Sequence, residues 1–123
     1  MTQEEIQEYN KRCAEFLGGL YVRDESLSFE PKGRWHINKF PDALQDYNLK
    51  FHSDWNWIME LLEKIESLRY NTIIGHNLTV IQSPPVKKIS SIIAKVEHKN
   101  LSKKEAVVQA INQFLIWYNE NNK

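Results

Sequence analysis

Two short runs rich in β-branched residues constrain the fold of this chain more than any other feature. Residues 70–75 and 78–82 are rich in Ile, Val and Thr, and Gly75-His76-Asn77 joins them. Such runs around a turn signal predict a β-hairpin. Ser83-Pro84-Pro85 then breaks the second strand, because proline cannot donate a hydrogen bond to a strand ladder. A lone hairpin is only marginally stable in water, so other parts of the chain must support it.

Two capping boxes predict helices at the two ends of the chain. Residues 2–5 (TQEE) and 102–105 (SKKE) each place a hydroxyl three residues before a carboxylate. In that spacing each side chain can satisfy the other residue's free backbone N–H. Apolar residues at helical intervals follow both boxes, so we expect helices over about residues 3–17 and 103–119. Gly18-Gly19 supplies a left-handed end for the first helix.

A third helix is predicted over about residues 54–68, where Ser53 or Asp54 can cap its N-terminus. Trp55 and Trp57 are two positions apart, about 200° around a helix axis, so they cannot face the same core. We assign Trp55 to the buried stripe and leave Trp57 on the flank, where the arm covers it or it is exposed as a binding anchor. The stripe comprises Trp55, Ile58, Leu61, Leu62, Ile65 and Leu68.

The rest of the chain gives weaker signals. Residues 88–97 fit both a helical period and strand alternation, and we favour a third antiparallel strand because it would support the hairpin. Residues 20–51 form an irregular arm, in which Tyr21-Val22 and 35–37 are candidates for short strands. The predicted fold is therefore α+β, a small antiparallel three-stranded sheet with three helices packed on it, in the order helix, arm, helix, meander, helix.

Size and composition place the chain among ordinary globular domains. Its 123 residues are 41% hydrophobic and 26% charged, which predicts one domain over residues 1–123. Cys13 is the single cysteine, so no internal disulfide forms. Residues 2–8 are acidic and polar, unlike a signal peptide, and no apolar run approaches the ~20 residues that span a bilayer. We therefore expect a cytoplasmic protein with no membrane partner.

No motif for catalysis, a cofactor or a metal stands out. The four histidines are scattered without short ligand spacing, and Cys13 lies on the apolar face of its helix, so we predict no metal site and no reactive thiol. His52-Ser53-Asp54 has the residue types of a catalytic triad, but chain neighbours rarely point at one centre. Glu60, Glu63 and Glu66 suit the solvated flank of a helix. We expect a protein that is not an enzyme and needs no cofactor.

Two groups of basic residues are candidates for binding. The segment 32–39 interleaves basic and aromatic side chains, a pattern that suits phosphate contact with base stacking, although solvated charges are the simpler reading. Its candidate residues are Arg34, Trp35, His36 and Lys39. In residues 87–104 six lysines are opposed only by Glu97, which predicts a patch for RNA or an acidic protein unless they are ordinary edge-strand lysines. These are Lys87, Lys88, Lys95, Lys99, Lys103 and Lys104.

Several blocks of sequence resemble small phage and prophage proteins of Bacteroidetes-type bacteria. They are residues 13–18 (CAEFLG), 49–60 (LKFHSDWNWIME), 64–66 (KIE), 102–107 (SKKEAV) and 114–119 (FLIWYN). The layout is also similar to the phage ABA-sandwich domain, a helix–sheet–helix unit. The resemblance implies a fold and a phage setting, and it transfers no catalytic residue.

Small phage proteins of this size are often host-takeover factors. By analogy we expect a non-enzymatic factor that binds and inhibits a host defence protein or ribonucleoprotein complex, as an anti-CRISPR protein does. An RNA-binding accessory protein that uses residues 87–104 is the alternative, and a structural phage protein is a weaker one. The net charge of zero favours a protein partner, because nucleic-acid binders are usually basic overall. The oligomeric state stays open.

Overall fold

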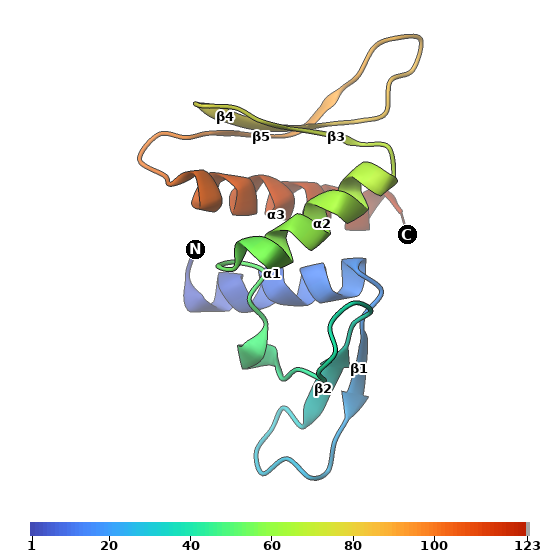
Figure 1. The fold of residues 1–123 in the computed structure, drawn as a ribbon, viewed down its shortest axis with the longest axis vertical. Coiled ribbons are helices and arrows are strands. Elements are labelled where there is room, and N and C mark those ends of the chain that lie inside the picture. Colours follow the sequence, from blue (N-terminus) through green and yellow to red (C-terminus); the bar gives the residue numbers. More distant parts are fainter. Residues whose placement is uncertain (123) are drawn as a thin grey trace. The chain divides into compact units, whose positions relative to one another are not determined.

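The computed structural model describes residues 1–122, which form two compact units (Figure 1). Unit 1 is residues 1–51 and unit 2 begins at His52. The mixed α+β fold predicted from the sequence is confirmed, whereas the single domain stays a prediction. The elements are α1 (Gln3–Phe16), β1 (Leu20–Arg23), β2 (Gly33–His36), the short 3-10 helix η1 (Asp46–Asn48), α2 (Trp55–Ser67), β3 (Asn71–Ile74), β4 (Leu78–Gln82), β5 (Ile92–Glu97) and α3 (Lys103–Asn121).

The first helix of unit 1 begins and ends as its sequence predicts. The Thr2 hydroxyl accepts a hydrogen bond from the Glu5 backbone N–H at 3.1 Å, and the Glu5 carboxylate accepts one from the Thr2 N–H at 3.2 Å. Gly18 follows the last turn with φ +78°, a conformation that glycine adopts without steric cost. The capping box and the glycine therefore set the limits of α1.

The arm of unit 1 contains short strands at both places that the sequence offered as candidates, Tyr21-Val22 and residues 35–37, although the second strand ends at His36. Strands β1 and β2 pair antiparallel, from Leu20 opposite His36 to Arg23 opposite Gly33. The Tyr21 ring covers Gly33, where an added Cβ would lie 2.1 Å from the Tyr21 Cζ. The pairing of β1 with β2 spans a nine-residue loop. Local periodicity cannot show which strands pair, because the pairing depends on contacts between residues distant in the sequence.

Unit 2 contains the predicted meander, with strand order β3-β4-β5. The strand reading of residues 88–97 is confirmed, although β5 begins only at Ile92. Helices α2 and α3 lie on the same side of this sheet (Figure 1). Ile81 and its partner Ala94 are each only 1% exposed, whereas Ile73 on the next register position is 50% exposed. One face of the sheet is thus buried, and on the other face Val80 is buried while its partner Ile73 is exposed.

The connection between β4 and β5 extends beyond the sheet as a narrow hairpin (Figure 1). Val86 and Ile89 exchange backbone hydrogen bonds of 2.9 and 3.0 Å around Lys87 and Lys88. Both lysines have positive φ, 53° and 68°, as the two central residues of a type I′ turn require. At positive φ the Cβ atom lies too close to the following carbonyl oxygen, so these two lysines hold a sterically unfavourable conformation. Asparagine and glycine are the residues that usually occupy such turns.

The two helices of unit 2 form its core with the sheet. The Asp54 carboxylate caps α2 by accepting from the Asn56 N–H at 2.9 Å, which decides between the two predicted caps. Ser102 and Glu105 form the predicted capping box of α3. Ring contacts join Phe114 of α3 to Tyr70 at 4.9 Å between centroids. No helix of the described residues is long and apolar enough to cross a membrane.

Candidate functional site

The basic and aromatic segment of β2 is largely engaged within unit 1. The Arg34 guanidinium donates to the Asp24 carboxylate at 2.7 Å. Hydrogen bonds lower the pKa of Asp24 to about 2, with the Ser26 side chain as the largest cause and Arg34 as the next. Trp35 is 5% exposed, and its indole N–H donates to Asp46 at 2.8 Å. This tryptophan therefore presents no free ring for stacking on a base.

The other two candidates in this segment are exposed, but they do not extend one basic surface. His36 lies at the end of β2 with its side chain in solvent. Lys39 follows in a turn, at φ 74°. We predicted a site at residues 32–39 that combines phosphate contact with base stacking. Trp35 cannot supply the stacking surface, because its side chain points inward from β2 while that of His36 points outward.

Of the two tryptophans of α2, Trp57 lies on the flank as predicted, whereas Trp55 does not lie in the core. Trp55 is 38% exposed, while Trp57 is half-buried. The buried residues of this helix are Ile58, Leu61, Leu62 and Ile65. On a helix with 3.6 residues per turn, both tryptophans lie at the margins of that stripe, on opposite sides. Helical periodicity therefore cannot show which of the two tryptophans is more buried. The assignment of Trp55 to the core was wrong.

The six candidate lysines of unit 2 do not form one patch. Lys87 and Lys88 lie at the tip of the β4–β5 hairpin, whereas Lys99 and Lys103 lie beyond the opposite end of β5 (Figure 1). Lys95, on the exposed face of β5, lies between the two groups. The strand itself separates them by its six residues, about 20 Å of extended chain.

Part of the second group is engaged in local interactions. The Lys104 ammonium donates to the Ser53 backbone carbonyl at 2.8 Å, next to the cap of α2. Lys99 lies 3.9 Å from the Glu97 carboxylate, although both side chains are mostly exposed. The strongest remaining concentration of positive charge in residues 87–104 is therefore the pair at the hairpin tip.

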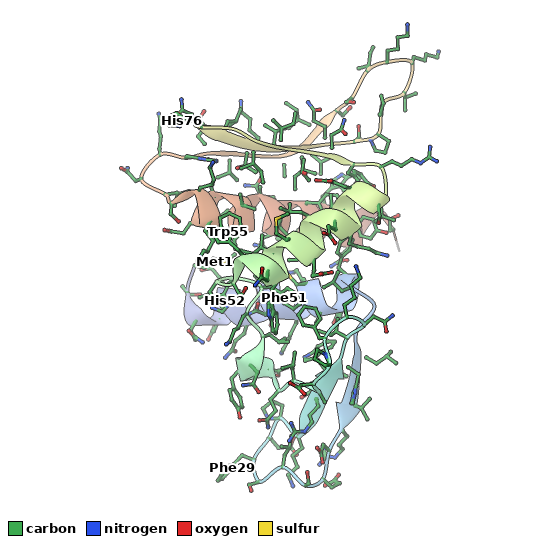
Figure 2. The ribbon with its side chains drawn as sticks, in the orientation of Figure 1. Met1, Phe29, Phe51, His52, Trp55 and His76 are labelled. Atoms are coloured by element: carbon green, nitrogen blue, oxygen red, sulfur yellow. The ribbon has the colours of Figure 1, made fainter. Side chains whose placement is uncertain are left out.

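Unit 1 contains a groove that sequence reasoning missed. Its main hollow, of about 600 Å³, is lined by the side of α1, the β1–β2 loop and the η1 region. Phe29 from the loop and Tyr47 from η1 line it and are 83% and 78% exposed. Figure 2 shows Phe29 on the loop between the strands, with its ring directed outward. We call this feature the aromatic groove.

A smaller hollow of about 320 Å³ continues the groove towards β1 and β2. The two hollows share Lys11, Pro31 and Asp46, and the smaller one adds Glu15, Tyr21 and Trp35. The Tyr21 and Trp35 rings pack at 5.1 Å between centroids. Both hollows of the aromatic groove are therefore lined by aromatic and by charged side chains.

The charges that line the groove are mainly negative. Among the described residues that line it, Lys11 is the one cation, and the carboxylates are Glu15, Glu30 and Asp46. Burial raises the pKa of Tyr21, and the negative charges of Asp46 and Glu30 raise it further.

The sequence carried only a faint signal of the aromatic groove, because Phe29 and Tyr47 are isolated aromatic residues in segments without periodicity.

Two of the residues considered for covalent chemistry have other roles in the fold. Cys13 is buried, and desolvation raises the pKa of its thiol well above the ordinary value. Asp54 of the triad-like sequence caps α2 instead of orienting a histidine. Among residues 1–122, no cluster of three or more His, Cys, Asp or Glu side chains could hold a metal ion.

Comparisons with protein families, curated proteins and solved structures found no match for this chain. The resemblance to phage proteins and to the ABA-sandwich layout therefore stays a prediction from the sequence blocks. The candidate sites rest on the geometry of the two units.

Proposed function

We propose that this protein is a non-enzymatic binding factor that recognises a partner protein through the aromatic groove. The observation that carries the proposal is the exposure of Phe29 and Tyr47 on the lining of a hollow of about 600 Å³. Ligand sites are typically hollows of about 300–1,000 Å³ with aromatic walls and a few polar groups. Large aromatic side chains next to a hollow are also typical anchors of protein interfaces.

The kind of partner is supported by the sequence resemblance alone. We propose a host protein or ribonucleoprotein complex of a bacterial defence system, which the factor inhibits in the cytoplasm, as an anti-CRISPR protein does. A small domain can block a larger complex by covering one of its surfaces, with no chemistry of its own. The buried Cys13 thiol, with its raised pKa, is consistent with that non-enzymatic role.

RNA binding is the second candidate, and the turn between β4 and β5 favours it. Lys87 and Lys88 are exposed next to each other at the end of a projecting hairpin, where both ammonium groups can reach phosphates. The separation of the other lysines and the burial of Trp35 count against an extended RNA surface. A protein partner is therefore our first choice.

A capture experiment with the full chain discriminates the two functions. Tagged wild-type protein, a Phe29→Ala/Tyr47→Ala variant and a Lys87→Gln/Lys88→Gln variant are incubated with lysate of a Bacteroidetes-type host, with and without nuclease. We expect a protein that is captured despite nuclease, lost with the aromatic variant and retained with the lysine variant. Capture that nuclease abolishes, and that the lysine variant loses instead, would establish the RNA-binding alternative.

A further inference from the structure

The balance of charge in the aromatic groove indicates what kind of segment fits it. One lysine, Lys11, faces three carboxylates there, so the lining carries two more negative than positive charges. The same balance holds for unit 1 as a whole, since residues 1–51 contain seven Lys and Arg against nine Asp and Glu. A ligand with positive charge is therefore complementary to both the groove and its surroundings.

Asp46 is the carboxylate best placed to receive such a ligand. One of its oxygens, Oδ1, accepts the hydrogen bond of the Trp35 indole, which holds the carboxylate in a fixed orientation. Within the described residues, no hydrogen bond reaches its other oxygen, Oδ2, and an ionised carboxylate can accept several. Glu30 is less available, because its two oxygens already accept from Arg23 and from the Lys32 backbone N–H.

The aromatic walls favour an arginine among the cationic side chains. A guanidinium is planar, stacks on aromatic faces and pairs with a carboxylate through a fork of N–H donors. Phe29 and Tyr47 supply exposed rings on the hollow that Asp46 also lines. A phosphate would meet only Lys11 in this groove and would be repelled by the neighbouring carboxylates.

We propose that the aromatic groove binds a basic segment of the partner protein, with an arginine stacked on Phe29 or Tyr47 and paired with Asp46. This inference rests on the proposed function, because it names the chemistry of the surface that the same groove recognises. Two hollows of about 600 and 320 Å³ that share Lys11, Pro31 and Asp46 leave room for more than one side chain of that segment.

The test uses the purified full chain and synthetic peptides. Acetyl-Gly-Arg-Gly-Arg-Gly-amide is titrated into isotope-labelled protein, and backbone and side-chain resonances are followed by NMR at low salt. The same peptide with glutamine, and then glutamate, in place of arginine gives the charge dependence. We expect the arginine peptide to bind with a dissociation constant of about 1 mM, and the shifts to concentrate on Lys11, Phe29, Asp46 and Tyr47.

Matched variants connect the binding to the carboxylate and the rings. Asp46→Asn keeps an oxygen for the Trp35 indole but removes the charge, and we expect it to weaken binding about threefold to fivefold. Asp42→Asn is the control, because Asp42 belongs to unit 1 but lines a different hollow. Tyr47→Ala should weaken binding by a similar factor to Asp46→Asn. The dispersion of the backbone amide resonances reports whether each variant keeps its fold.

Three outcomes would overturn the inference. They are equal binding of the glutamate peptide, equal effects of Asp42→Asn and Asp46→Asn, and tighter binding of a short single-stranded RNA in the groove. The capture experiment separates this result from the proposed function. If the aromatic variant loses a protein partner but the arginine peptide does not bind, the groove recognises a protein by other chemistry.

Discussion

Replacing Phe114 by alanine tests the assignment of the core in unit 2. Its side chain is fully buried, and its ring meets those of Tyr70, Trp117 and Tyr118 at centroid distances of 4.9, 6.1 and 5.7 Å. Truncating a buried phenylalanine costs about 3–5 kcal/mol. Each favourable ring pair adds about 0.5–1.5 kcal/mol beyond area burial, and the Tyr70 pair has the favoured edge geometry. We therefore expect a loss near the upper end of that range, about 4–5 kcal/mol.

Urea unfolding followed by circular dichroism measures this loss. Because small domains have total stabilities of about 5–15 kcal/mol, Phe114→Ala will approach complete unfolding. Phe114→Leu keeps more of the buried volume and should lose less stability than Phe114→Ala. Ile116→Ala is the matched control on the same helix, since Ile116 is 39% exposed and should change stability by about 0.5 kcal/mol or less. Equal losses from Phe114→Ala and Ile116→Ala would show that the buried face of α3 is misassigned.

Three further predictions concern pH, helix caps and the hairpin tip. Burial raises the pKa values of Cys13 and Tyr9, so the folded state keeps protons that the unfolded state loses at high pH. The free energy of unfolding should therefore fall as pH rises above about 8.5. Urea titrations at several pH values should show a flatter fall for the Cys13→Ala/Tyr9→Phe variant. Ser102→Ala removes the cap of α3 and should cost about 1 kcal/mol in urea unfolding, whereas an unchanged midpoint would show that the box is not formed. Lys88→Gly should relax a positive φ of 68° and raise the free energy of unfolding by up to about 1 kcal/mol, and a destabilised variant would contradict the turn assignment.

The local elements could be predicted from the sequence because their signals lie within a few residues. The capping boxes at Thr2 and Ser102 use hydrogen bonds between positions three apart, and the structure contains both. The hairpin of β3 and β4 follows from β-branched runs on either side of a turn. Such features depend on backbone geometry and burial of one face, which any chain with the same local pattern shares.

The binding surfaces were decided by tertiary contacts. The aromatic groove combines α1, the β1–β2 loop and the η1 region, which lie far apart in the sequence and carry no common motif. The lysines of residues 87–104 read as one basic run, yet a strand of six residues separates them into two groups. A run in sequence becomes a patch only where the backbone folds its members together.

The sequence by itself thus determined the helices, the meander and the α+β class of this protein, through interactions between near neighbours. The tertiary structure alone decided that Trp35 is turned inward to Asp46, that Trp55 rather than Trp57 is the exposed tryptophan of α2, and that Phe29 and Tyr47 share one hollow. The physical reason is that burial depends on what packs against a side chain. Packing partners come from distant parts of the chain, so residue type and local periodicity cannot reveal them.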